Sequence, residues 1–252
     1  MRLLAGLALG LAALAIGGYV AFRATTDESF EPASVTAAVE RFRALPASAR
    51  QSELAEHGDA PQPGVYVYAT RGFEVSHVLG VRRHAYPSRT TMTISTHGGS
   101  CRHLRWDALA TRWDATLACP DFALLRLVSH SEEHHFAGHT DRRTYRCTRN
   151  STPWRSRCTS GGTTATTRVL GMPSRHEVTV GGRRVETRLE HSRTRLAGET
   201  SGTVTTRTWV VPRTGLVVRR TIAEDSSTDT LVGAVRYEER ATLTLTSLRP
   251  RR

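Results

Sequence analysis

Residues 235–245 read VRYEERATLTL, and this stretch decides the fold class because apolar and polar side chains alternate along it. Alternation with a period of two is typical of a β-strand that packs on one face only. Glu239 is the exception, because it falls on the apolar side. An isolated carboxylate is costly to bury, so we expect Glu239 either to pair with an arginine or to lie where that face opens to water. The apolar face would hold Val235, Tyr237, Ala241, Leu243 and Leu245.

The two-residue period extends outward through most of the sequence after Gly64. Turn signals at 181–182, 197–198, 212–215 and 224–229 divide the second half into long strands. No helical pattern separates successive strands, which favours an antiparallel meander over a parallel α/β sheet. We therefore predict a mainly β fold with a large, curved, half-barrel-like antiparallel sheet. Its predicted strands are 65–71, 73–80, 89–97, 100–107, 112–119, 124–131, 134–147, 163–170, 175–180, 183–195, 203–211, 216–223 and 231–247.

The segment before the sheet is predicted to contain one or two short helices. Between Ser34 and Leu45 the apolar residues recur at three- and four-residue steps, which is the spacing of one helix face. Ser34 is a suitable N-cap and Pro46 would end the helix. A second helix is predicted over 47–56, with an extended stalk as the alternative. The Pro- and Gly-rich run 57–64 breaks regular structure and marks the start of the β domain.

The first residues of the sequence indicate export. Residues 3–22 are uniformly apolar between two arginines, and their length is enough to cross a bilayer core as one helix. A cleaved signal peptide is the alternative, but the best cleavage site, at 13–15, would leave an unusually short leader. We therefore predict a single-pass protein of the cell membrane, or a secreted protein if the leader is cleaved. The predicted parts are an anchor at 1–24, a helical or stalk linker at 25–63 and an extracytoplasmic β domain at 64–252.

The composition weakens a functional interpretation of the positive net charge. The chain has a formal net charge of +12, and all 35 of its basic residues other than histidine are arginine. Arginine without lysine is typical of a high-GC genome, and these arginines are spread along the sequence. A basic exterior attracts anionic lipids or acidic polymers, yet this spread favours a solvated surface over a dedicated anionic partner. Nucleic acid is not an expected partner, because the sequence has no aromatic–basic motif.

Four cysteines behind an export segment predict two disulfides. A hairpin centred near Ala110 would set Cys101 opposite Cys119, and a turn at 150–153 would set Cys147 opposite Cys158. Opposed residues in an antiparallel pair have Cβ atoms about 4.5 to 5.5 Å apart, close to what a disulfide needs. We therefore predict the pairs 101–119 and 147–158. A four-thiolate metal site is the alternative, which the lack of a Cys-x-x-Cys pair disfavours.

A histidine-rich run at 130–139, HSEEHHFAGH, offers His130, His135 and His139 as candidate metal ligands. It differs from the zinc-protease motif, in which a glutamate directly follows the first histidine on a helix. On a strand His135 and His139 would lie roughly 13 Å apart, too far for one ion unless Gly138 forms a bulge. We therefore predict an exposed strand and turn without a cofactor, and a metal site or a pH-dependent element is the alternative.

The sequence carries no motif of a catalytic nucleophile: it has no Gly-x-Ser-x-Gly, no Ser-x-x-Lys and no phosphate-binding glycine loop before a helix. Asp107 and Asp114 could mimic a paired-carboxylate site across the predicted hairpin. Each follows a tryptophan, so a repeated Trp-Asp at the rim of a hairpin explains them without catalysis. We predict no catalytic residue, while a triad assembled from distant residues stays open.

Residues 208–219, TWVVPRTGLVVR, resemble a recurring hairpin of the lipoprotein-localisation-factor superfamily. That group includes envelope lipid carriers and the periplasmic sensor that regulates an anti-sigma factor. The resemblance implies a strongly curved antiparallel sheet wrapped around helices, with an apolar cavity for acyl chains. This chain departs from the group because it has no lipidation cysteine and few helical segments after residue 60.

A broader resemblance covers 64–248, with the element YPSRTT at 86–91 and VRYEER at 235–240. This region is similar to a set of anchored or secreted proteins of high-GC Gram-positive bacteria, and that likeness implies no activity.

The sequence as a whole predicts a non-enzymatic, membrane-tethered extracytoplasmic β domain. It would bind a hydrophobic or amphipathic envelope ligand, such as a lipid, or an envelope protein, on a concave sheet face. A hydrolase of the envelope or cell wall is one alternative. A structural or signalling interaction module is the other.

Overall fold

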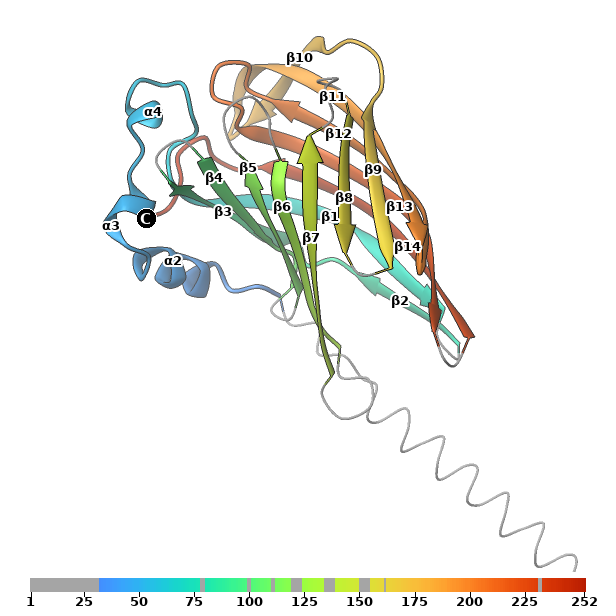
Figure 1. The fold of residues 1–252 in the computed structure, drawn as a ribbon. Coiled ribbons are helices and arrows are strands. Elements are labelled where there is room, and N and C mark those ends of the chain that lie inside the picture. Colours follow the sequence, from blue (N-terminus) through green and yellow to red (C-terminus); the bar gives the residue numbers. More distant parts are fainter. Residues whose placement is uncertain are drawn as a thin grey trace, which may run out of the picture.

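The computed structural model describes residues 32–77, 80–98, 101–109, 112–118, 124–133, 139–149, 155–160, 162–230 and 233–252. Three short helices precede a single antiparallel sheet that curls strongly (Figure 1). The predicted mainly β fold with a curved antiparallel sheet is therefore confirmed. The helices are α2 (Val35–Arg43), α3 (Ala47–Arg50) and α4 (Glu53–Glu56). The strands are β1 (Gly64–His77), β2 (Val81–Ala85), β3 (Arg89–His97), β4 (Cys101–Asp107), β5 (Arg112–Ala118), β6 (Leu124–Glu133), β7 (His139–Arg149), β8 (Arg155–Ser160), β9 (Thr163–Val169), β10 (Ser174–Val180), β11 (Arg183–Gly198), β12 (Thr200–Val210), β13 (Val217–Thr230) and β14 (Gly233–Leu245).

The strands follow one path, β10-β11-β12-β13-β14-β1-β3-β4-β5-β6-β7-β8-β9, with β2 paired to β1 at the side. Strand β9 also pairs with β11, where Val169 lies opposite Ser192 and Thr163 opposite Gly198. This pairing joins β9, at one end of the path, to β11, which lies next to β10 at the other end. The described strands therefore curl round on themselves, with an inner and an outer face. Nothing in the sequence pattern indicated this closure.

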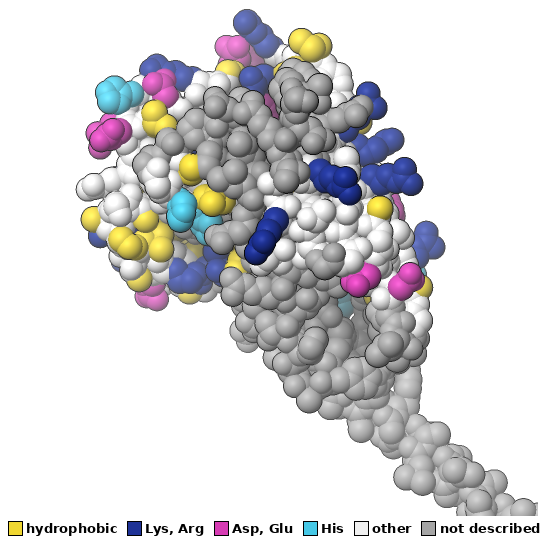
Figure 2. Space-filling view, in the orientation of Figure 1, with side chains coloured by type: hydrophobic (Ala, Val, Ile, Leu, Met, Phe, Trp, Pro, Cys, Tyr) yellow, Lys and Arg dark blue, Asp and Glu magenta, His cyan; other side chains and the backbone are white. Residues whose placement is uncertain are grey.

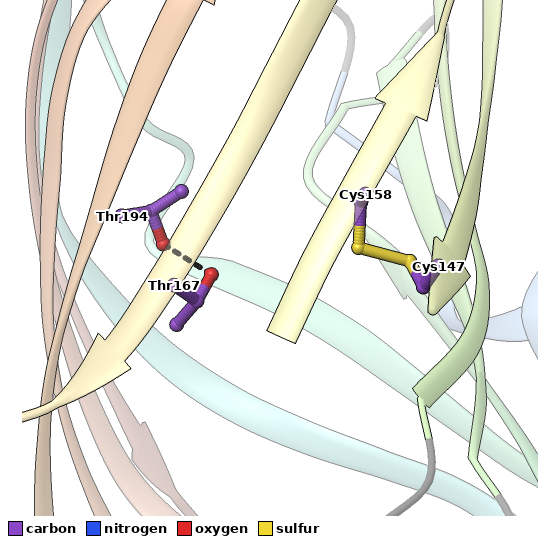
Figure 3. Close-up of a disulfide and its surroundings, with 4 residues drawn as sticks. All are labelled: Cys147, Cys158, Thr167 and Thr194. Atoms are coloured by element: carbon purple, nitrogen blue, oxygen red, sulfur yellow. Dashed lines mark hydrogen bonds between the residues drawn. A yellow bond between two sulfur atoms is a disulfide. The ribbon is translucent and has the colours of Figure 1, made fainter. Parts of the chain in front are cut away.

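The seam between β9 and β11 lies close to one disulfide (Figure 3). The hydroxyl groups of Thr167 and Thr194 share a hydrogen bond of 2.8 Å across the seam. On the neighbouring β7–β8 pair, Cys147 and Cys158 lie directly opposite each other and form a disulfide, with Cα atoms 4.0 Å apart. The predicted 147–158 disulfide is confirmed. Cys158 lies on strand β8, which was not among the predicted strands.

The second predicted disulfide is described on one side only. Cys101 is disulfide-bonded, and its predicted partner, Cys119, lies outside the described residues. Strands β4 and β5 pair with Arg102 opposite Ala118. This is the register of a hairpin centred on position 110, as predicted.

Helix α2 covers part of the outer face. Ser34 caps the helix by accepting a hydrogen bond of 3.2 Å from the Ala37 amide, as its sequence position predicted. One turn of helix brings Ala38 and Phe42 onto the same side, where both are buried against Val65 of β1. The predicted helix is therefore confirmed, and its apolar side packs on the sheet. The predicted second helix forms as the two short helices α3 and α4.

The inner face carries the main core. On β1 it holds the side chains of Tyr66, Tyr68 and Glu74, which alternate with the outward Val65. The curvature is strong enough that the Tyr68 hydroxyl reaches across β14 and donates to the Val217 carbonyl of β13 at 2.6 Å. The apolar positions predicted from 235–245 face this core at Ala241, Leu243 and Leu245. Other buried members of the cluster include Met92, Ile94, Trp106, Val178, Val180, Leu216, Val218 and Ile222.

Two interruptions predicted between or after strands are wrong. Strand β1 runs unbroken through Gly72, where a break was predicted. Gly72 has φ 150°, and a Cβ atom there would lie 2.1 Å from the Arg240 carbonyl of β14, so glycine here allows a close approach of two strands. The turn predicted at 224–229 is also wrong, because β13 continues to Thr230. Its polar residues continue the strand because they pair across the sheet: Arg240 bonds Asp225 at 2.9 Å.

Within the described part of the chain, no helix combines the length and the apolar character needed to cross a membrane. The predicted span at 3–22 lies outside the described residues. The anchor, its alternative cleavage and the boundary at residue 24 therefore stay predictions.

Candidate functional site

Three glutamates lie side by side on the inner face. Glu74 of β1 is opposite Glu239 of β14, and Glu239 is opposite Glu224 of β13. We call these three residues the glutamate row. Like charges placed directly opposite each other on neighbouring strands destabilise a sheet. The row therefore needs positive charge or hydrogen-bond donors from other parts of the protein.

Arg112 of β5 supplies most of this compensation. Its guanidinium pairs with Glu74, donates to the Tyr237 hydroxyl at 2.8 Å and lies 3.3 Å from the Glu239 carboxylate. Because β3 and β4 separate β5 from β1 in the sheet, the side chain spans the inner space. The prediction that Glu239 pairs with an arginine is confirmed, and its carboxylate is only 3% exposed.

Two tyrosines donate further hydrogen bonds to the carboxylates of Glu74 and Glu239. Tyr86 donates to Glu239 at 2.8 Å, and Tyr237 donates to Glu74 at 2.9 Å. Burial raises the pKa of both phenols, so they remain protonated donors. Burial alone would lower the pKa of Arg112, but the neighbouring tyrosines and glutamates raise it well above its ordinary value. Arg112 is therefore a permanent cation inside the sheet.

Glu224, the third member of the row, has a hydroxyl group rather than a guanidinium as its hydrogen-bond partner. It accepts a hydrogen bond of 2.7 Å from Ser226. Burial, followed by the charge of Glu239, raises the pKa of Glu224 to about 7. Its carboxyl group is thus poised between the neutral and the charged form near neutral pH.

Arg220 lies two inner-face positions from Glu224 along β13. Its Nε atom is buried without a hydrogen-bond partner. Burial lowers the pKa of this guanidinium, and the charges of Asp114 and Glu239 oppose that effect. None of the described ion pairs joins Arg220 to either carboxylate. The cation and the acids are therefore close enough to act on each other's charge, yet none of the described ion pairs joins them.

Asp114 and Trp106 lie on the same inner face, on strands β5 and β4. They are directly opposed on β5 and β4, and Asp114 lies one inner-face position beyond Arg112. Trp106 is 6% exposed, and its indole Nε1 is buried without a hydrogen-bond partner. Most buried donors in proteins are satisfied, and this region holds two of the buried side-chain nitrogens without a hydrogen-bond partner, those of Trp106 and Arg220. We call Asp114, Trp106, Arg220 and Glu224 the open polar group.

The inner face is graded from this polar region to an apolar one. Beyond Arg220 the opposed residues are Val218 of β13, Leu245 of β14 and Tyr68 of β1, all buried. Two apolar side chains at the edge of the core, Leu104 and Val204, are only partly buried. Part of the apolar inner surface is therefore left uncovered by the described chain.

The two aspartates that the sequence offered as a pair lie on opposite faces of the sheet. Asp107 is opposite Trp113 and Asp114 is opposite Trp106, so Asp107 points outward and Asp114 inward. The paired-carboxylate hypothesis is therefore wrong. The sequence already contained the evidence against it. A hairpin centred on position 110 sets position 107 opposite 113, and position 114, the next residue along, points to the other face.

Asp107 is instead fixed on the outer face. It accepts from Arg41 of α2 at 2.8 Å, from Arg105 at 2.8 Å and from Thr91 at 3.3 Å. These contacts tie α2 to the sheet, and they satisfy the carboxylate within the protein.

The predicted metal ligands are not tested by the structure. Strands β6 and β7 contain His130 and His139, but the side chains of both, together with all of His135, lie outside the described residues. Over the described ranges alone, no three or more His, Cys, Asp or Glu side chains are grouped so that they could hold a metal ion.

The exterior contrasts with the acidic inner face. Arginines are scattered over the face shown in Figure 2 rather than gathered in one patch. Beside α2, on the outside, lies a cleft of about 310 Å³ that Arg43, Arg50 and Arg252 help to line. Its arginines are exposed, and Arg43 and Arg50 donate to the backbone carbonyls of Arg252 and Leu45. None of the three is among the buried donors without a partner.

The hairpin that carries the superfamily resemblance is formed, with β12 and β13 joined by a turn in which Gly215 donates to the Val211 carbonyl at 2.8 Å. Comparison of the chain with protein-family models, curated proteins and solved structures finds no match. Membership of the superfamily therefore stays a prediction from that hairpin.

Proposed function

We propose that this chain is a non-enzymatic, membrane-tethered extracytoplasmic domain that binds an amphipathic envelope ligand on the inner face of its sheet. The tether is the predicted span at 3–22. The ligand would lay its apolar part against the uncovered core edge at Leu104 and Val204, and its polar part against the open polar group.

The observation that carries the proposal is the pair of buried donors without partners, Arg220 Nε and Trp106 Nε1. Leaving a buried donor unsatisfied costs about 1 to 3 kcal/mol. A ligand group that accepts hydrogen bonds would remove this cost in the bound state. The adjoining apolar surface gives the same ligand a second, hydrophobic contact.

The test is lipid extraction and mass spectrometry of the purified full chain, with a matched pair of variants on β12. Val204→Asp places a carboxylate on the half-buried inner surface opposite Glu224, whereas Ser201→Asp places one at an exposed position of the same strand. Both variants keep the predicted anchor, so lipid that adheres to the anchor is the same in all samples.

We expect the wild type and Ser201→Asp to retain the same lipid, and Val204→Asp to lose most of it, because a buried charge opposes apolar contact. Circular dichroism would check that Val204→Asp is folded. Equal lipid content in all three samples, or none in the wild type, would overturn the proposal.

A further inference from the structure

We propose that the open polar group binds a zwitterionic headgroup that joins a phosphate to an ammonium, as in phosphatidylethanolamine. Arg220 and Trp106 would donate to the phosphate oxygens, and Asp114 and Glu224 would accept from the ammonium. This inference rests on the proposed function, because it names the polar end of the same ligand.

The donors argue for an acceptor-rich group. The guanidinium of Arg220 presents a planar fork of N–H donors, which suits phosphate oxygens. Its Nε–H is buried and unpartnered, and so is the indole N–H of Trp106. Neither Leu243 nor Thr208, the cross-strand neighbours of Arg220, carries an anionic group. A phosphate would satisfy both donors and match the charge of the guanidinium.

The acids argue for a cationic group beside that phosphate. Asp114 faces the same side and makes no ion pair with a described residue. Among the described residues, the Glu224 carboxyl group accepts a hydrogen bond from the neutral Ser226 and from no cation. An ammonium has three donors and a compact positive charge. It would satisfy acceptors that Arg112 does not reach, since that guanidinium is occupied by Glu74, Glu239 and Tyr237.

A simple ion of either sign fits less well. The carboxyl and guanidinium groups that act on one another in this region are those of four acids, Glu74, Glu224, Glu239 and Asp114, and two arginines, Arg112 and Arg220. His84 of β2, opposite Glu74, is a further ionisable side chain. A lone phosphate dianion would add negative charge to an excess of acids. A lone amine would leave the Arg220 and Trp106 donors unsatisfied. A zwitterion meets both sets of groups without changing the net charge.

The burial of these residues permits both access and specificity. Asp114, Arg220 and Glu224 are each partly buried, so solvent and a ligand can reach them. They are also shielded enough that a charge-assisted hydrogen bond is stronger than it would be on the open surface.

The test is calorimetric titration of the full chain in a neutral detergent with three short-chain lipids: dihexanoyl-phosphatidylethanolamine, dihexanoyl-phosphatidylglycerol and dihexanoylglycerol. The lipids share acyl chains and differ in the headgroup, which is zwitterionic, anionic or uncharged. We expect phosphatidylethanolamine to bind at least about tenfold tighter than the other two, since only its headgroup offers charge-assisted hydrogen bonds to both the donors and the acids.

The variants Arg220→Met and Asp114→Asn remove one partner each. Each is expected to weaken phosphatidylethanolamine about tenfold or more and to leave dihexanoylglycerol unchanged. Glu186→Gln, at an exposed position on β11, is the control and should bind like the wild type.

The outcomes separate this inference from the function on which it rests. If all three lipids bind equally and Arg220→Met has no effect, the headgroup assignment is wrong and the binding of an amphipathic ligand stands. If phosphatidylglycerol binds tightest, the site is an anion site and the zwitterion is excluded. If none of the lipids binds and Val204→Asp loses no lipid, the proposed function itself fails.

Discussion

Asp107 and Asp114 lie in one hairpin, each directly after a tryptophan, yet their side chains point to opposite faces and differ in their hydrogen-bond partners. Asp107 points outward and receives hydrogen bonds from two arginines and a threonine. Asp114 points inward and faces a guanidinium that it does not touch. The same Trp-Asp dipeptide thus serves a saturated structural site on one face and an incomplete polar site on the other.

The arginines of the inner face repeat this contrast. Arg112 is occupied by two glutamates and a tyrosine, whereas the Nε of Arg220 has no partner. The partners of Arg112 all belong to the protein, so a role in stabilising the fold accounts for it. A buried donor without a partner, such as the Arg220 Nε–H, destabilises the free protein, and a ligand that accepts from it would remove that cost.

The largest expected effect separates the two inner arginines. Arg112→Met should lower the free energy of unfolding by about 4 kcal/mol, because it leaves Glu74 and Glu239 opposed and buried without a cation. Arg220→Met should leave stability within about 1 kcal/mol of the wild type, since it removes a poorly satisfied charge. Urea unfolding, followed by circular dichroism, measures both. Equal losses would show that Arg220 is as important for stability as Arg112, and would contradict a ligand-binding role for Arg220.

The two aspartates should differ in the same direction by a smaller amount. Asp107→Asn should lower the free energy of unfolding by about 3 kcal/mol and loosen α2, because Arg41 and Arg105 lose their common anion. Asp114→Asn, its matched variant, should change stability by less than about 0.5 kcal/mol. Urea unfolding gives the free energies, and hydrogen exchange of the α2 amides reports on the docking of the helix. A large loss in Asp114→Asn would mean that its carboxylate has a structural role.

The sequence could predict local features of the site better than its assembly. Alternation placed Glu239 on the apolar face and so predicted an arginine partner, but Arg112 is 127 residues away in the sequence. The glutamate row depends on the registers of β1, β14 and β13, which no local pattern specifies. The continuation of β13 through 224–230 was missed because acidic and serine residues usually indicate turns, and here they pair with Arg240 and with one another.

The smallest effect concerns Glu224 and its dependence on pH. Burial and the charge of Glu239 raise the pKa of Glu224 from the ordinary value of 4.5 to about 7 in the folded protein. The folded chain therefore holds this proton more tightly than the unfolded chain does. The resulting stabilisation is complete below about pH 4.5 and is lost as the pH rises through 7.

Glu224→Gln stays neutral at every pH, so it should remove this loss and exceed the wild type by about 2 kcal/mol in free energy of unfolding at pH 8. The charged groups that act on Glu224 are Glu239 of β14 and both Asp114 and Arg112 of β5. They are unchanged in the variant, so the difference between the two curves isolates Glu224. Unfolding by urea at intervals between pH 5 and 8 measures it, with the exposed Glu186→Gln as control. Parallel curves for the wild type and Glu224→Gln would show that Glu224 is already charged at pH 5. The pKa of Glu224 would then not be raised by folding, and burial and the charge of Glu239 would not act on it as inferred.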